Sequence, residues 1–467
     1  MDKIRNYAKT AVIYFIGNVF SKLVALFLLP LYTNRLEPYV MGEYDYAVTL
    51  LNFAAPICFF QIWDAMFRFS FDYENENQKR KVVSNSFIVC VWGIVVFSLL
   101  LVVLQSVVRF QYIGLIYAYG LTIAINYLYS YLARVYRNNL LFSVSGFVNS
   151  LIVAICNIVL ILRYNLGLQA LYISVICGAI AQCIMIEIFL RPISKISLKD
   201  YDKKLITEMI KFSVPLCIAS ISYWLLSGYT KVLIVHFLGT EENGLYAITN
   251  KFASLINMIV SIFQFAWNEM AYIYNKDEGR NLMYTTATAY IIHYVIMASC
   301  CLMIVSKIMF PVVIGTAYQA AIIYLPTAII GVGLNAIAGF IGTVFSTEKK
   351  TKYIFSSTFA AAVLNVVFGG ILTKHFALHG AMIALAGSFM ILLTIRIYWM
   401  NNYIGTNVKI CQAKHALLIA STIIFFYVCN KTILDIVYLG ILLLIEIIIN
   451  WKLYKRLFVI VKAGCKK

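Results

Sequence analysis

Long apolar stretches, separated by short polar segments, follow one another along almost the whole chain. A helix that crosses a membrane needs about 20 predominantly apolar residues. Runs near that length occur at fourteen places, residues 8–31, 44–63, 85–105, 112–132, 141–162, 168–190, 213–237, 245–267, 283–305, 320–345, 354–372, 378–400, 413–429 and 433–449. The pattern therefore predicts an all-α polytopic membrane protein with about 14 transmembrane helices.

The longest polar stretch, residues 191–212, divides these runs into two sets of six, with two more at the end. We expect an N-terminal six-helix lobe at 1–190, a cytoplasmic amphipathic linker at 191–212, a C-terminal six-helix lobe at 213–400, and two extra helices with a basic cytoplasmic tail at 401–467. Apolar residues from Leu198 to Phe212 recur at helical spacing, which is typical of a helix at a membrane surface. Ser197 and Asp200 fit a capping box at the start of that helix.

Short motifs recur in the two lobes in the same order. Leu36…Gly42-Glu43-Tyr44 in the first lobe corresponds to Leu238…Gly244-Leu245-Tyr246 in the second, at an offset of 202 residues. Farther on, Asn157-Ile158-Val159 corresponds to Asn365-Val366-Val367. Because each lobe has six spans, the two copies enter the membrane from the same side. We therefore expect them to be related by a pseudo-two-fold axis along the membrane normal, as in transporters built from two bundles.

The charged residues suggest an orientation for the predicted helices. The chain has 38 Lys and Arg against 20 Asp and Glu, a formal net charge of +18. With the N-terminus inside, 29 of the basic residues fall in inner segments and 6 in outer loops, which agrees with the positive-inside rule. We therefore expect both termini in the cytoplasm. The positive charge then faces an anionic inner leaflet, and we expect no nucleic-acid partner.

Composition and motifs narrow the functional class. Hydrophobic residues make up 62% of the chain, against about 45–50% in a soluble domain. The 11 cysteines lie mostly in apolar runs without a CxxC pair, so we expect neither a disulfide framework nor a metal site. The sequence contains no P-loop, GxSxG motif or cluster of catalytic carboxylates. These features predict a transporter and not an enzyme, with no cofactor.

Three lysines, Lys22, Lys231 and Lys251, lie inside predicted helices. A charge at the centre of a membrane helix costs at least about 2.5–3.5 kcal/mol, so each lysine needs a reason to be there. Asn18 lies four residues before Lys22 and shares its helix face. We expect these residues to line a wet cavity in which the ammonium groups meet an anion. The alternative is that each long side chain reaches back to the membrane surface.

Other charged residues lie near the ends of predicted helices. Asp64 and Arg68 are four residues apart and can form an ion pair; alternatively, Arg68 is an inner-gate contact for an anion and Asp64 a cation or proton site. Arg35 is an outer-gate candidate. Glu446 is isolated in the last predicted helix, where it either titrates for ion coupling or is a shielded carboxyl that faces a neighbouring helix.

Several motifs resemble those of a known family. They are Asn6-Tyr7, Gly17-Asn18, Leu29-Pro30, Leu36…Gly42-Glu43-Tyr44, Lys211-Phe212-Ser213-Val214-Pro215, Trp224, Lys231, Leu238-Gly239, Gly244-Leu245-Tyr246 and Asn365…Leu378-His379-Gly380-Ala381. Over nearly its whole length the chain resembles the flippases that transport O-antigen, capsule and other oligosaccharide repeat units. These proteins belong to the multidrug/oligosaccharidyl-lipid/polysaccharide exporter superfamily. Family members often carry an acidic residue just before the basic one at Lys231, whereas this chain has Thr230. We therefore expect Lys231 to lack a local ion pair and to be freer to meet an anion.

The resemblance implies two six-helix lobes around a central cavity, plus two C-terminal helices. It also implies export of a polyprenyl-pyrophosphate-linked oligosaccharide across the bacterial cytoplasmic (inner) membrane by alternating access, for capsule, exopolysaccharide or O-antigen synthesis. The expected partners are this lipid and the bilayer. A polysaccharide polymerase and chain-length machinery are further candidates, and we expect a monomer. Coupling to Na⁺, H⁺ or the membrane potential fits better than coupling to ATP.

Two other functions stay open. A cation-coupled antiporter of drugs or metabolites, on the same fold, should carry acidic residues deep in a lobe, and Asp64 is the one inward candidate in the first lobe. A membrane polysaccharide polymerase or ligase should have a large outer loop rich in Arg and His, whereas all predicted outer loops are short.

Overall fold

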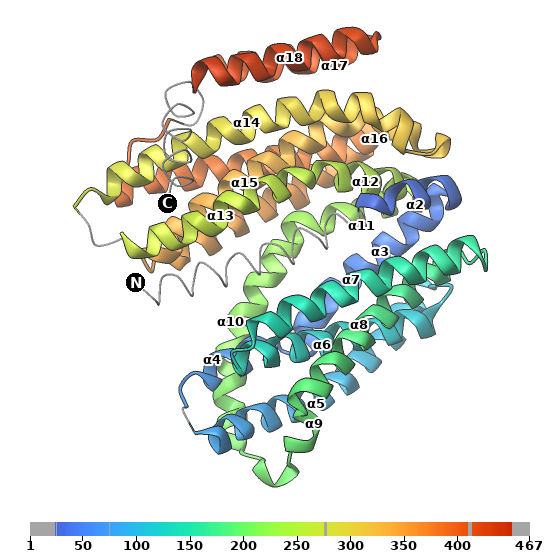
Figure 1. The fold of residues 1–467 in the computed structure, drawn as a ribbon, viewed down its shortest axis with the longest axis vertical. Coiled ribbons are helices and arrows are strands. Elements are labelled where there is room, and N and C mark those ends of the chain that lie inside the picture. Colours follow the sequence, from blue (N-terminus) through green and yellow to red (C-terminus); the bar gives the residue numbers. More distant parts are fainter. Residues whose placement is uncertain (1–23, 25, 74, 275–277, 410–412, 451–467) are drawn as a thin grey trace, which may run out of the picture. The chain divides into compact units, whose positions relative to one another are not determined.

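The computed structural model describes residues 24, 26–73, 75–274, 278–409 and 413–450. Within these ranges every regular element is a helix, which confirms the predicted all-α class (Figure 1). Contacts divide the chain into two compact units, Met1–Ala247 with Ala362–Ala381, and Ile248–Ala361 with Met382–Lys467. The predicted lobe boundaries stay a prediction, and Asn18 and Lys22 lie outside the described residues.

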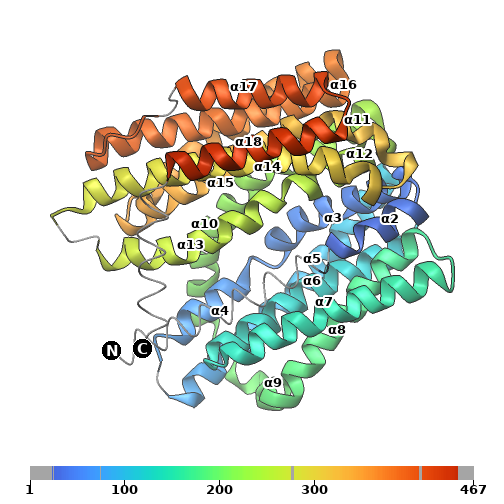
Figure 2. The same cartoon turned by 45° about the horizontal axis from the view of Figure 1, so that its top comes forward.

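The first unit is built mainly from helices that precede residue 248. Long helices α5, α6, α7 and α8 lie side by side in both views (Figures 1 and 2). A core that includes Phe59, Trp63, Phe97 and Met209 packs among α3–α6 and α10. The helices are α2 (Leu29–Arg35), α3 (Pro38–Cys58), α4 (Ile62–Ser70), α5 (Glu76–Val108), α6 (Ile113–Val135), α7 (Asn139–Leu162), α8 (Leu168–Leu190), α9 (Pro192–Lys195), η1 (Leu198–Asp200), α10 (Lys203–Ser227), α11 (Tyr229–Leu238) and α12 (Thr240–Ala253), which continues into the second unit.

The second unit is organised around the long helix α14. It packs against α15, α17 and α18, and α13 packs against both α14 and α15 (Figure 2). The elements are α13 (Leu255–Ile273), α14 (Arg280–Val313), η2 (Thr316–Tyr324), α15 (Leu325–Thr347), α16 (Thr351–Ile404), α17 (Ala413–Val428) and α18 (Thr432–Ile449). The middle of α16 belongs to the first unit.

Among the described residues, nine helices are long and apolar enough to cross a membrane, or ten if the bent pair α3 and α4 counts as one span. The predicted number of fourteen is therefore not confirmed. The predicted span 213–237 is divided between α10 and α11, and the predicted span 245–267 is divided between α12 and α13. The predicted span 413–429 corresponds to α17, which has only 16 residues.

Two breaks show how the chain changes direction. The axes of α3 and α4 differ by 50°, and Phe60 and Gln61 between them adopt left-handed backbone angles. In α16, Phe376 and Ala377 leave helical geometry, so the 54-residue run consists of two helices. Their junction falls between the predicted spans 354–372 and 378–400.

The segment before α10 differs from the predicted linker. Residues 198–200 form a 3₁₀ turn, and α10 begins at Lys203 and continues without a break to Ser227. The capping box predicted at Ser197 and Asp200 is wrong, because the Asp202 carboxylate caps α10 by accepting from the amides of Lys204 and Leu205. The predicted surface helix is wrong too, since Leu205 and Met209 are buried in the core.

Asp200 instead holds the segment before α10 to the start of α5. Its carboxylate pairs with the Arg80 guanidinium at 3.0 Å and accepts from the Ser84 hydroxyl. Asn85 donates to the Asp200 carbonyl and accepts from the Asp202 amide. The segment is therefore fixed by side chains of α5, 115 or more positions away in the sequence.

Candidate functional site

The two repeated glycine motifs meet each other in the first unit. A methyl group on Gly42 in α3 would overlap the carbonyl oxygen of Thr240, and one on Gly244 in α12 would overlap the carbonyl oxygen of Pro38. Thr240 follows Pro38 by the same 202 positions that separate the glycines. The contact is therefore reciprocal between the two copies of the motif, and only glycine allows the backbones to approach this closely.

The close contact of α3 and α12 at Gly42 and Gly244 is a glycine crossing. Lys231 lies beside the glycine crossing and is held by a carboxylate. Its Nζ atom is 2.9 Å from Oδ1 of Asp45, and the two side chains are 18% and 19% exposed. Asn243, which is fully buried, donates to the Gly42 carbonyl at 2.8 Å and approaches Oδ2 of Asp45 at 3.4 Å. The site thus joins one cation, one anion and one amide from α3, α11 and α12.

Lys231 lacks a local ion pair, as expected, but the expectation that it is therefore freer to meet an anion is wrong. The acidic partner is not the preceding residue but Asp45, 186 positions earlier in the chain. A carboxylate on α3 does for Lys231 what an adjacent acid would do, because a partly buried ammonium needs a counter-ion. An anion that binds Lys231 must therefore displace Asp45 or share the Lys231 ammonium with it.

Thr230 has a structural contact of its own. Asn365, from the part of α16 that belongs to the first unit, donates to the Thr230 hydroxyl at 3.0 Å and to the Leu226 carbonyl at 2.9 Å. Leu226 lies at the end of α10 and Thr230 at the start of α11, so one amide bridges the break between these helices. Thr230, at which the chain departs from the family pattern, thereby joins the motif residue Asn365 to the helix that carries Lys231.

The other charged residues predicted for the site lie on other helices than Lys231. Arg35 is exposed in the last turn of α2. Arg68 pairs with Asp72, so the predicted pair with Asp64 is wrong; a helical side chain at position 68 reaches both neighbours, and the exposed Asp72 is the partner. Asp64 instead interacts with the hydroxyl of Tyr131. Lys251 is half-buried in α12.

Glu446 belongs to a polar cluster that sequence reasoning did not find. His293 on α14 lies between Glu446 on α18 and His415 on α17, within hydrogen-bond distance of both. The prediction that Glu446 faces a neighbouring helix is thus confirmed. His293 and His415 occur singly inside apolar runs, which was the available signal for them.

These features define a class, an all-α membrane protein with several spans. Solved structures share the fold. The lipid II flippase MurJ, in an inward closed conformation, is similar with a TM-score of 0.63 and 15% identity, over 95% of this chain and 100% of that one. A multidrug resistance MATE family transporter of the MOP superfamily, inward-facing, has a TM-score of 0.61 and 13% identity, over 89% and 94%. A MOP superfamily transporter from Pyrococcus furiosus has a TM-score of 0.58 and 13% identity, over 85% and 96%.

The family follows from the sequence itself. The model of the polysaccharide biosynthesis protein family matches residues 7–268, more than half of the 467-residue chain. The chain belongs to this family, which confirms the resemblance seen in its motifs. No curated protein matches the chain.

Proposed function

We propose that this protein is a flippase that carries a polyprenyl-pyrophosphate-linked oligosaccharide repeat unit across the bacterial cytoplasmic membrane by alternating access. Its membership of the polysaccharide biosynthesis family is the observation that carries the proposal. A fold shared with a lipid flippase supports it. The product would serve capsule, exopolysaccharide or O-antigen synthesis.

Lys231 is the described residue that best fits recognition of the pyrophosphate. Its ammonium is held between helices by Asp45, with the Asn243 amide alongside. Charge-assisted hydrogen bonds between an ammonium and phosphate oxygens are stronger than neutral ones. When α3 and α12 separate at the glycine crossing, the pyrophosphate takes the place of Asp45 on Lys231. The other predicted cations, Lys22, Lys251, Arg35 and Arg68, would guide the headgroup before and after this step.

The driving force fits the charge of this lipid. With the termini in the cytoplasm, a pyrophosphate moves outward from a negative interior. That movement gains about 2.3 kcal/mol per charge for each 100 mV of membrane potential. The proposed partners are the lipid-linked oligosaccharide and the bilayer, with the polymerase and chain-length machinery downstream, and the protein acts as a monomer.

The test uses the full-length protein in liposomes that carry a polyprenyl-pyrophosphate oligosaccharide in one leaflet. Appearance of the sugar in the other leaflet is measured for wild type, Lys231→Ala and Lys307→Ala. Lys307 is the matched control, because it also pairs with an aspartate, Asp435, at 3.1 Å. The proposal predicts transport by wild type and the control, and slow transport by Lys231→Ala.

Two results would replace the proposal. If wild type moves no lipid but exports a small cationic drug against a Na⁺ or H⁺ gradient, the protein is an antiporter. If it lengthens the oligosaccharide, it is a polymerase. Equal transport by all three variants would keep the flippase and remove Lys231 from its mechanism.

A further inference from the structure

Three titratable side chains from three helices form a continuous chain in the second unit. The Nδ1 atom of His293 is 3.1 Å from Nε2 of His415, and its Nε2 atom is 2.9 Å from Oε2 of Glu446. Asn450 donates to the other Glu446 oxygen at 2.7 Å. The His293 and Glu446 side chains are only 9% and 13% exposed. The cluster is thus built from α14, α17 and α18 and shielded from solvent.

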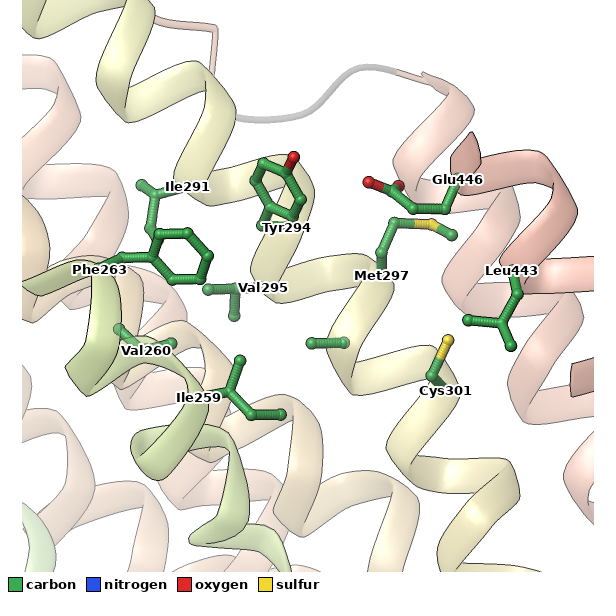
Figure 3. Close-up of a pocket in the computed structure, with 11 residues that line it drawn as sticks. Ile259, Val260, Phe263, Ile291, Tyr294, Val295, Met297, Cys301, Leu443 and Glu446 are labelled. Atoms are coloured by element: carbon green, nitrogen blue, oxygen red, sulfur yellow. The ribbon is translucent and has the colours of Figure 1, made fainter. Parts of the chain in front are cut away.

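The two ends of the hydrogen-bonded series His415–His293–Glu446 line different cavities. Glu446 lines a cavity of about 300 Å³ together with apolar side chains of α13 and α14, among them Val260, Phe263 and Met297 (Figure 3). His293 and His415 line a second cavity of about 330 Å³, with Lys414 and Thr285. The hydrogen bonds therefore connect two spaces that are each large enough for water.

The arrangement differs from that of a metal centre. Metal ligands must direct their donor atoms at one point, whereas His293 uses its two ring nitrogens for partners on opposite sides. No group of three His, Cys, Asp or Glu side chains with metal-binding geometry occurs in the part of the chain that the structure describes. Protons, by contrast, need donors and acceptors in a row, which is what these residues provide.

We propose that the His415–His293–Glu446 chain is a proton-binding site that links the two cavities and sets the rate of lipid transport through its protonation. The coupling part of this inference rests on the proposed flippase function. The proton-binding part rests on the geometry alone.

The position of each hydrogen atom can be followed through the His415–His293–Glu446 chain. With both histidines neutral and Glu446 ionised, Nε2–H of His293 donates to Glu446, and Nε2–H of His415 donates to Nδ1 of His293. This leaves Nδ1 of His415 as a bare acceptor, and that buried atom has no hydrogen-bond partner in the described structure. The chain is thus ready to accept one proton at this nitrogen.

Addition of that proton reverses the two hydrogen bonds that His293 makes with His415 and with Glu446. One proton binds Nδ1 of His415, the Nε2 proton of His415 passes to Nδ1 of His293, and the Nε2 proton of His293 passes to Oε2 of Glu446. One proton has entered on the histidine side and one now sits on the carboxyl in the other cavity, while both links remain intact.

The groups that face the chain set the conditions for this transfer. Lys414 on α17 is the nearby cation, and Cys301 and Tyr294 on α14 lie near Glu446 and His293. The α13 side chains in the Glu446 cavity are apolar. Asp435 on α18 is already paired with Lys307 of α14. No described anion besides Glu446 therefore competes for the proton.

The proton site is tested first without substrate. Infrared difference spectra of the purified full-length protein are recorded between about pH 5 and about pH 8, where histidine-linked sites titrate. We expect a band of a protonated carboxyl that is absent in Glu446→Gln, shifted in His293→Gln, and unchanged in the control Glu187→Gln. Glu187 is a matched control because it also accepts from a side chain of another helix, the Tyr129 hydroxyl. A band that persists in Glu446→Gln would overturn the proton site.

The coupling is tested by transport in liposomes over the same pH range. We expect the wild-type rate to change about threefold across the pH unit centred on the midpoint, as for one titrating group, and the Glu446→Gln rate to stay nearly constant over the same unit. Asp435→Asn, which breaks the other α14–α18 pair, should keep the wild-type profile. An identical profile in Glu446→Gln would overturn the coupling. Absence of lipid transport by wild type would overturn both the flippase and the coupling, whereas the infrared result would still decide the proton site.

Discussion

The glycine crossing of α3 and α12 gives the sharpest prediction, because one added methyl group should have opposite effects at two glycines. Replacing Gly42 by Ala places a Cβ atom on the Thr240 carbonyl oxygen, and Cβ atoms do not approach other atoms within 3.0 Å. The backbones must therefore separate by about 1 Å or more, and such overpacking costs about 1–3 kcal/mol. Gly146, in the interior of α7, has no atom within 4 Å of the added group.

Gly146→Ala should therefore stabilise the protein by about 0.5–1 kcal/mol, because alanine loses less entropy in a helix. Gly42→Ala and Gly244→Ala should each destabilise it. The variant that combines Gly42→Ala with Gly244→Ala should lose clearly less free energy of unfolding than the sum of the two single losses, because one separation of the backbones relieves both overlaps. The free energy of unfolding is measured by denaturant titration in detergent.

A Gly42→Ala variant as stable as Gly146→Ala would refute the reasoning, since the backbones would then have room at the crossing. Fully additive effects of Gly42→Ala and Gly244→Ala would also contradict it. They would mean that the two motifs do not share one contact.

Two further predictions concern charges near this crossing. Asp45→Asn should lower the free energy of unfolding by about 3 kcal/mol, because it leaves the Lys231 ammonium partly buried without its counter-ion, and Asp45→Leu combined with Lys231→Met should recover most of the loss in the same titration. Burial, and to a lesser degree the Glu241 charge, raise the pKa of Glu242 above its ordinary value of 4.5. The folded state then binds the Glu242 proton more tightly than the unfolded state does. Ionisation of Glu242, as the pH rises through the raised pKa, therefore lowers the free energy of unfolding. Glu242→Gln should therefore stabilise the protein at neutral pH, and the gain should vanish on acidification below about pH 4.5, where both states are protonated.

The helical class and the position of most helices followed from the sequence. An apolar run of membrane length has few alternatives to a helix, because its backbone must satisfy its own hydrogen bonds in lipid. The number of spans did not follow from the sequence. An apolar run shows where a helical stretch begins and ends, but it does not show where the helix is broken in between. Gly228 and Ser254 separate helices within runs that look continuous.

The predicted alternation of inner and outer ends agrees with contacts that join distant residues. Arg80 and Asp200, which pair, both fall in predicted inner segments, whereas Lys307 and Asp435, which also pair, both fall near predicted outer ends. Lys231 and Asp45 likewise share one predicted side. The number of spans and the orientation stay predictions, with which these three pairs are compatible.

The partners of the site residues could not be read from the sequence in the same way. Asp45 lies 186 positions before Lys231, and His415 and Glu446 lie 122 and 153 positions after His293. No local spacing connects residues so far apart. The repeat offered one usable signal, because Asp45 and Asn243 directly flank the two motifs that meet at the glycine crossing.

The proximity of the glycine crossing to the Lys231 pair has a consequence for transport. Because Asp45 lies on α3, and Lys231 lies on α11, which is joined to α12 at Gly239, separation of α3 from α12 also strains the 2.9 Å contact between Lys231 and Asp45. An empty protein that opened here would lose a partly buried ion pair at a cost of about 3 kcal/mol, which lowers the open population about 150-fold. In the proposed function, a bound pyrophosphate would supply a new anion to Lys231 and remove that cost. The same pair that stabilises the closed crossing would then make opening depend on substrate, as a flippase needs if it is not to leak.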